Sequence, residues 1–127
     1  MKLFHYYDLS FSEIFIFDDY MINQMREGEE ITPNHNYVLR DLVKKHFTNK
    51  KIIYISNRVT NYAVNPLVYK EVEKIPNLVA MIIIANKETS RKNAEYEKGF
   101  FNRPFKICNN LTEAIMWVDK LIYNKNS

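Results

Sequence analysis

Hydrophobic residues recur along this chain with two different periods, and these periods predict its secondary structure. Short runs rich in Ile, Val, Phe and Tyr are typical of strands. They occupy residues 12–17, 20–25, 51–55, 78–85 and 104–107. Apolar residues that recur three or four positions apart are typical of helices packed on one side. They occupy residues 33–47, 66–75, 90–101 and 113–123. The predicted order of elements is therefore β-β-α-β-α-β-α-β-α.

The first two predicted strands are separated only by Asp18 and Asp19, which predicts a hairpin. In the run SEIFIF at residues 12–17, neither of the two alternating faces is polar. Such a strand is expected to be covered on both faces or to pair with another subunit. Residues 3–7 belong either to this strand or to a separate strand before it.

The helix boundaries are predicted from capping residues. Thr32 followed by Pro33 indicates the start of the first helix, because Thr caps well and Pro suits the first helical position. The Asn-Pro pair at residues 65–66 indicates the start of the second helix. Thr112 is the expected cap of the last helix, and Trp117 is expected to anchor that helix in the core.

The alternation of strands and helices predicts an α/β fold with a mostly parallel sheet, right-handed crossovers and the N-terminal hairpin at the edge. The run LVAMIIIA at residues 78–85 is apolar throughout, as is typical of a central strand buried on both faces. A chain of 127 residues is long enough for one hydrophobic core. We therefore expect a single domain over residues 1–127.

Composition and charge narrow the classes of partner. Hydrophobic residues make up 46% of the chain and charged residues 26%, as in ordinary globular domains. The net charge is +3, and Lys44-Lys45 and Lys50-Lys51 are the densest basic positions. Cations there complement the negative end of the first predicted helix. No basic stripe is interleaved with aromatic residues, so we expect no nucleic-acid partner.

The chain is expected to reside in the cytoplasm. Its single cysteine, Cys108, cannot form an internal disulfide, which favours a reducing compartment. The first ten residues, MKLFHYYDLS, lack the apolar core of a signal peptide. The longest apolar run, at residues 78–85, is far shorter than the roughly 20 residues of a membrane span.

Common catalytic and cofactor motifs are missing. With only two glycines, Gly28 and Gly99, the chain has neither a Gly-rich dinucleotide loop nor a P-loop. His5, His35 and His46 lack the spacing of a zinc helix. No G-x-S-x-G segment is present to expose a nucleophilic serine. We therefore expect no cofactor and no metal, and ordinary hydrolases and nucleotide enzymes are disfavoured.

The candidate ligand-binding residues lie in the loop after the third predicted strand. They are Ser56, Asn57, Arg58 and Tyr62. Ligands of open α/β sheets usually bind at the carboxyl ends of the strands, where this loop begins. Arg58 can clamp a carboxylate or phosphate through two hydrogen bonds, and Tyr62 can cover the ligand. The alternative is that Arg58 pairs with an acidic side chain of the protein and Asn57 satisfies backbone groups of a turn.

A second pattern resembles the receiver domain of response regulators. Residues 15–19, FIFDD, resemble the first strand and acidic pair of that family, and Arg103-Pro104-Phe105 resembles its basic-Pro-aromatic element. The resemblance implies that the acidic pair holds Mg²⁺, a cation that prefers carboxylate oxygens. The position implied for the phosphoacceptor aspartate reads Ser56-Asn57. The alternative is that the two acids simply occupy a hairpin turn.

Over nearly its whole length, the chain resembles small bacterial STAS-like proteins, relatives of sulfate-transporter and anti-sigma-antagonist domains. The resemblance rests on YISNR at residues 54–58 and on F-K-I-x-x-x-L-T-E-A-I-x-W-V at residues 105–118. It implies a β-α fold whose functional surface lies near the carboxyl ends of the strands. Regulatory members carry a phosphorylated serine in a D-S-S-G-type segment. Ser56 lies near that position, but the segment itself is absent.

These observations predict a non-enzymatic binding or regulatory domain that recognises a protein or a small anionic ligand. A degenerate receiver-like regulatory domain is one alternative. Another is an enzyme with an unrecognised site that uses Arg58, Tyr62 and a carboxylate such as Glu97, which otherwise is a charge on a helix surface. A further alternative is self-association into a homodimer through the aromatic hairpin, which the change Phe15→Glu is expected to abolish.

Overall fold

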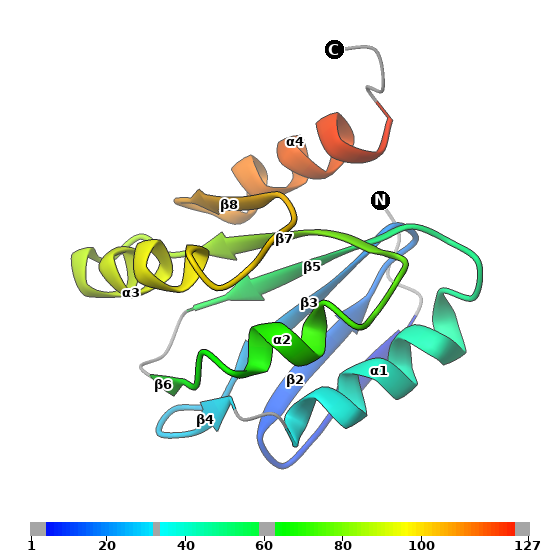
Figure 1. Ribbon diagram of the computed structural model, residues 1–127, viewed down its shortest axis with the longest axis horizontal. Helices are drawn as coiled ribbons and strands as arrows, with labels where there is room; N and C mark the ends of the chain where they lie inside the picture. Colours follow the sequence, from blue (N-terminus) through cyan, green and yellow to red (C-terminus); the bar gives the residue numbers. More distant parts are fainter. Residues whose placement is uncertain (1–4, 32–33, 59–62, 124–127) are drawn as a thin grey trace.

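The computed structural model describes residues 5–31, 34–58 and 63–123 (Figure 1). Its strands are β1 His5–Asp8, β2 Ser12–Ile16, β3 Tyr20–Met25, β4 Glu30–Ile31, β5 Ile52–Asn57, β6 Ala63–Val64, β7 Leu78–Ile84 and β8 Phe105–Cys108. Its helices are α1 His35–His46, α2 Val68–Val72, α3 Glu88–Lys98 and α4 Leu111–Ile122. The predicted elements are all present. Two short strands, β4 and β6, are added to the predicted order, and β1 corresponds to the alternative in which residues 3–7 belong to a separate strand.

Six strands form one sheet in the order β1-β2-β3-β5-β7-β8. The pairs β1–β2 and β2–β3 are antiparallel. The pairs β3–β5, β5–β7 and β7–β8 are parallel. The α/β class and the mostly parallel sheet are therefore confirmed. The predicted hairpin corresponds to β2 and β3, but the strand at the edge of the sheet is β1. The remaining strands, β4 and β6, pair in parallel with each other.

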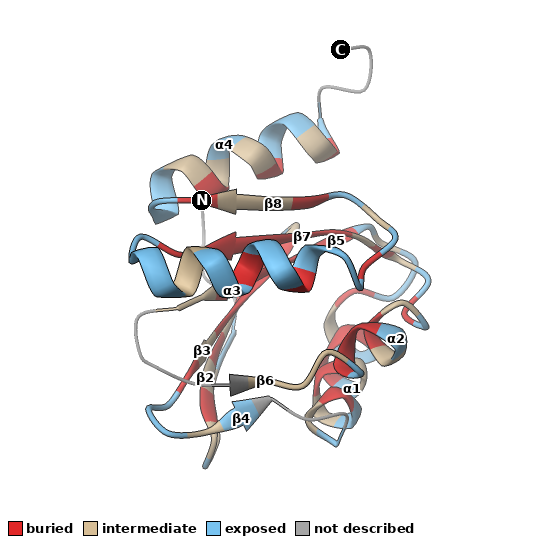
Figure 2. Cartoon of the chain, turned by 60° about the vertical axis from the view of Figure 1, so that its left-hand side comes forward, coloured by how far each residue is buried: buried red, intermediate tan, exposed pale blue. Residues whose placement is uncertain are grey.

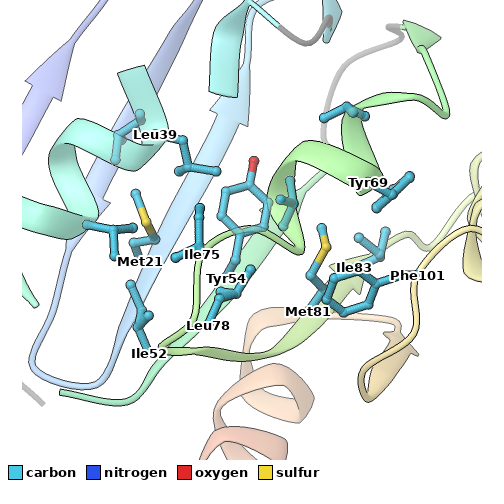
Figure 3. Close-up of a cluster of buried hydrophobic side chains, with 14 of the residues drawn as sticks. Met21, Leu39, Ile52, Tyr54, Tyr69, Ile75, Leu78, Met81, Ile83 and Phe101 are labelled. Atoms are coloured by element: carbon cyan, nitrogen blue, oxygen red, sulfur yellow. The ribbon is translucent and has the colours of Figure 1, made fainter. Parts of the chain in front are cut away.

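Helices pack on both faces of the sheet, and the two faces have separate cores. Side chains from α1, α2 and α3 share one core with alternate residues of β2, β3, β5 and β7. Among the described helices, only α4 contributes to the other core. Figure 3 shows Tyr54 reaching from β5 between α1 and α2 in the larger core, with Tyr69 and Phe101 beside each other. The all-apolar run of β7 follows from this double coverage, because it is covered on both faces.

The hairpin strand β2 is covered fully on only one face. Ile14 and Ile16 are 2% and 1% exposed and belong to the larger core. Phe15 and Phe17 lie on the other face and are only half-buried, at the margin of the α4 core. On the same face the edge strand β1 places Tyr6, which is 46% exposed, opposite Phe15. The apolar outer face of the run SEIFIF therefore forms a partly exposed aromatic surface.

The structure of α4 differs from two sequence predictions, one on its cap and one on Trp117. Its cap is Asn110 rather than Thr112, because the Asn110 side chain accepts a hydrogen bond from the Glu113 backbone N–H at 2.9 Å. Trp117 is only half-buried, and the ammonium groups of Lys106 and Lys120 lie 4.4 and 4.9 Å from its ring centre. The positions that α4 buries are Ala114, Val118 and Ile122. Small and β-branched residues therefore dock this helix, and Trp117 covers the margin.

The starts of α1 and α2 lie close to the positions predicted from the sequence. Thr32 and Pro33 lie outside the described residues, and α1 begins at His35. The segment after residues 65–66 begins with turns, in which Val68 N–H donates to the Asn65 carbonyl at 2.9 Å, and only Val68–Val72 are α-helical. Figure 2 shows exposed residues along much of α3, whose buried positions are Ala94 and Glu97. Among the described residues no helix is long and apolar enough to cross a membrane.

Candidate functional site

Arg58 follows the carboxyl end of β5, and the alternation of the strand determines where its side chain goes. The Arg58 N–H donates to the Ile84 carbonyl at 3.0 Å, so the backbone stays beside β7 for one residue beyond the strand. Successive residues of a strand point to opposite faces. Tyr54, Ser56 and Arg58 therefore share the face covered by α1, α2 and α3, where they line one small cavity. Asn57 points to the opposite face.

Arg58 forms a buried ion pair with Glu97 of α3. Its Nη1 donates to Glu97 Oε2 at 2.8 Å, and its Nη2 donates to Glu97 Oε1. The two side chains are only 6% and 5% exposed. This two-bond arrangement is the strongest geometry available to an arginine and a carboxylate. It joins the end of β5 to α3.

Tyr69 of α2 completes the network by donating its hydroxyl to the same Glu97 Oε1. Tyr69 is 2% exposed. Burial, the neighbouring carboxylate charge and this hydrogen bond together raise the pKa of the Tyr69 phenol, with burial the largest cause. The phenol therefore remains a donor, and Glu97 accepts from two elements at once. The Arg58–Glu97–Tyr69 network links β5, α2 and α3.

The cavity beside this network is very small. Its volume is about 20 Å³, and Asn36, Tyr54, Ser56, Arg58 and Tyr69 contribute its polar lining. A volume of roughly 10–15 Å³ is the minimum for one water molecule. The Asn36 amide is already engaged, since its Nδ2 donates to the Val68 carbonyl at 2.9 Å. The cavity can therefore hold about one water and cannot enclose a substrate.

The three sequence-predicted site residues that the structure describes do not form one surface. Ser56 is 2% exposed and lies beneath α1 and α2. Asn57 lies on the other face, where its Nδ2 donates to Gln24 Oε1 of β3 at 3.2 Å. Arg58 is paired inside the protein, as the alternative interpretation of its role had it. Tyr62 lies outside the described residues.

Two members of the network were misjudged or missed in the sequence. Glu97 was expected on a helix surface, but it is 4% exposed. The signal was its spacing: it follows Ala94 by three positions and precedes Phe101 by four, and both of those residues are buried. Tyr69 was not singled out, because it sits beside the apolar residues Val68 and Val72 and resembles a core position. Its hydroxyl is a buried donor that needs a partner.

The receiver-like acidic pair lies at the other end of the sheet. Asp18 and Asp19 occupy the turn between β2 and β3, and the Asp19 carbonyl accepts from Ile53 N–H at 3.1 Å near the start of β5. The Asp18 carboxylate pairs with Lys50. Burial raises the pKa of Asp19, and the charge of Asp18 adds to the shift. The pair is therefore separated by the length of β5 from Ser56-Asn57, so the two cannot form one receiver-like site.

The remaining candidate groups do not extend the site. Cys108 is 2% exposed, and burial raises the pKa of its thiol to about 11, with the Glu113 charge contributing. Within residues 5–31, 34–58 and 63–123, no three His, Cys, Asp or Glu side chains converge to hold a metal ion.

Comparison with protein-family models, with curated proteins and with solved structures finds no match for this chain. The arguments that follow therefore rest on the geometry of the site.

Proposed function

We propose that this chain is a non-enzymatic, STAS-like binding or regulatory domain that recognises a protein or a small anionic ligand at the carboxyl ends of its parallel strands. The STAS-like assignment is supported by the residue patterns at 54–58 and 105–118, which lie on β5 and on the β8–α4 unit. The observation that carries the proposal is the buried Arg58–Glu97–Tyr69 network. It fixes the point at which the loop after β5 leaves the sheet.

In this proposal Arg58 supports the binding surface from beneath instead of contacting the ligand. Its guanidinium is already occupied by Glu97, and separating a buried pair costs several kcal/mol. A binding surface that is rigid before binding loses less conformational entropy on binding, which raises affinity. The network thus contributes to recognition by fixing the end of β5 at Arg58.

The contacts are proposed to come from a polar surface that we call the carboxyl edge. It consists of Gln24, Asn57, Asn86, Lys87 and Asn109, which lie at or just after the ends of β3, β5, β7 and β8. All five are exposed or half-buried. Side-chain amides and one lysine supply hydrogen-bond donors suited to a carboxylate, a phosphate or a peptide backbone.

The enzyme alternative receives less support. The structure does bring Arg58 and Glu97 together, as that alternative required. However, the adjoining cavity of about 20 Å³ leaves no space for a substrate. Ser56 is also too deeply buried for a modifying enzyme to reach its hydroxyl without local opening. Recognition at the surface is the function that the geometry supports best.

The test is native mass spectrometry of the protein isolated gently from the cells that produce it, with a denatured control. We expect a small molecule or partner protein that is lost on denaturation. The double variant Lys87→Ala/Asn57→Ala should lose this species, whereas Lys92→Ala, an exposed lysine on α3, should retain it. A protein without any bound species, or one retained equally by both variants, would contradict the proposal.

A further inference from the structure

A cleft lies at the end of the described part of the molecule opposite the carboxyl edge. It has a volume of about 530 Å³ and lies between the last turns of α1 and the loop that joins α2 to β7. Ile52 N–H, at the start of β5, donates to the Asn77 carbonyl in this loop, which places the cleft at the amino ends of β5 and β7. The two helices lie side by side on one face of the sheet (Figures 1 and 2). Small-molecule sites typically have volumes of about 300–1,000 Å³.

Hydrogen bonds hold both walls of the cleft in place. The Asn77 side chain donates to the carbonyls of Phe47 and Lys50 at 2.9 and 2.8 Å, which joins the end of α1 to the loop before β7. Arg103 braces the same loop from behind, because its Nη1 donates to the Ile75 and Leu78 carbonyls at 2.7 Å. The cleft is therefore largely preformed, as ligand sites usually are.

The rim of the cleft is cationic. Arg40, Lys44 and Lys74 line it, and none of the described residues that line it is Asp or Glu. Lys74 Nζ lies 3.0 Å from the carboxylate of Glu71, three positions earlier in the chain, and an exposed pair of this kind contributes little. Within the described residues, Arg40 and Lys44 have no ion-pair partner. This contrasts with Arg58, whose charge is fully paired.

Two further features make the cleft suitable for an anion that also has an apolar part. Val43, Phe47 and Ile75 form its floor and are 3%, 1% and 4% exposed, and the exposed Pro76 lies beside them. An apolar body placed there would be removed from water mainly by contact with Pro76 and the aliphatic stems of the cations. The carbonyl groups at the end of α1 would ordinarily repel an anion. Two of them are already occupied, since Asn77 donates to the Phe47 carbonyl and Thr48 Oγ1 donates to the Lys44 carbonyl at 2.6 Å.

We propose that this cleft, the basic cleft lined by Arg40, Lys44 and Lys74 over Val43, Phe47 and Ile75, binds a small amphipathic anion. The carboxylate or phosphate of the ligand lies against Arg40 and Lys44, and its ring or short aliphatic body lies on the apolar floor. Arginine binds such groups through two hydrogen bonds, and lysine adds a flexible point charge. The site is separate from the carboxyl edge, and its failure would leave the proposed function untouched.

The test is an NMR titration of the ¹⁵N-labelled protein with 4-phenylbutyrate. We expect saturable shifts of backbone amides within residues 40–49 and 74–77. Acetate, which lacks the apolar body, and 4-phenylbutanol, which lacks the charge, should each bind at least roughly tenfold more weakly. Absence of a saturable shift up to about 10 mM, or equal binding of the alcohol, would overturn the proposal.

Matched charge variants locate the binding site. Arg40→Gln and Lys44→Gln should each weaken binding of 4-phenylbutyrate roughly tenfold. Lys45→Gln removes the same charge from the neighbouring exposed position of α1, outside the lining of the cleft, and should change the affinity less than about twofold. Equal losses in Lys44→Gln and Lys45→Gln would show attraction to net charge alone and would also overturn the proposal.

Discussion

The two ends of the parallel strands use basic residues in opposite ways. At the carboxyl ends, Arg58 is 6% exposed and both of its terminal nitrogens are bound to Glu97. At the amino ends, Arg40 and Lys44 border a cleft of about 530 Å³ without a carboxylate among the described residues that line it. The charge of Arg58 is therefore paired inside the protein, whereas the charges of Arg40 and Lys44 remain available to a ligand.

This difference shows that the type of residue alone does not identify a binding site. Arg58 follows a strand at the position where α/β proteins usually bind ligands. Lys44 lies near a helix end, where a cation needs no ligand to explain it. The neighbours of each residue lead to the opposite assignment. A carboxylate of α3 pairs with Arg58, whereas the loop before β7 lines the cleft near Lys44 with Lys74, an amide and apolar groups and with no carboxylate.

The largest effect should come from breaking the network at the carboxyl ends. Arg58→Met leaves the Glu97 carboxylate buried without its cation, and such losses typically cost about 3–5 kcal/mol of unfolding free energy. Urea unfolding followed by circular dichroism measures this change. The double variant Arg58→Met/Glu97→Met should recover much of the loss, because no buried charge then remains.

Glu95→Gln is the matched control for this experiment. Glu95 is exposed and lies two positions before Glu97 on α3. Its replacement should change the unfolding free energy by less than about 0.5 kcal/mol. If Arg58→Met had an equally small effect, the contrast between the two ends would be wrong.

A smaller loss is expected from Tyr69→Phe. This change removes the hydroxyl that donates to Glu97 and keeps the buried ring. A hydrogen bond to a charged group contributes about 1.5–3 kcal/mol, so a destabilisation of that size should appear in urea unfolding. Tyr37→Phe serves as the control, since Tyr37 is 61% exposed. Indistinguishable curves for the two variants would remove Tyr69 from the network.

Near the amino ends of the parallel strands, titration of His46 should make the stability of the protein depend on pH. Burial lowers the pKa of His46 below 6.5, and the charges of His5 and Lys45 add to the shift. Its Nε2 lies 2.6 Å from the Tyr7 hydroxyl. Because the folded state then binds fewer protons than the unfolded state, this contribution to stability is complete above pH 6.5 and is lost as the pH falls through the folded pKa.

The measurement compares urea unfolding at pH 7.5 and pH 5 for the parent protein and for His46→Gln. The parent should lose more stability than the variant between these two pH values, and the difference isolates His46 from the carboxyl groups. In addition, Lys45→Gln should raise the His46 pKa measured by NMR. A variant with the same pH dependence as the parent would contradict the assignment.

The smallest effect on stability is expected at the basic cleft itself. Arg40→Gln and Lys44→Gln remove charges that have no ion-pair partner in the described part of the chain. Each should change the unfolding free energy by less than about 0.5 kcal/mol, while weakening the binding of 4-phenylbutyrate. Thermal unfolding of the variants beside the parent tests this. A loss of more than about 1 kcal/mol would mean that these cations stabilise the fold.

Local patterns predicted the fold well because its signals are local. The apolar run of β7 and the three- and four-residue spacing in α1 and α4 identified their elements directly. The short strands β4 and β6 carried no such signal, since two residues are too few to show a period. The cap of α4 was misplaced because Asn110 and Thr112 are both good capping residues, and the choice depends on where β8 ends.

The candidate site was harder to predict because its partners come from distant segments. Arg58 and Glu97 are 39 positions apart, and Tyr69 and Glu97 are 28 apart. One sequence gives no information about which residues meet across such distances. Likewise, the basic cleft combines the end of α1 with the loop after α2, whereas the sequence showed only two pairs of lysines near a helix end.

The buried thiol of Cys108 can report how often the core between α4 and the sheet opens. The thiol lies in the core that α4 forms with the sheet, beside Ala114 and Val118. It is the only cysteine in the chain, so every alkylation event must occur at this position. A reagent can reach it when this part of the core opens, through α4 or through the edge strand β8, and the alkylation rate under native conditions therefore reports how often that happens. The same chain thus carries an intrinsic reporter for local opening of the core between α4 and the sheet.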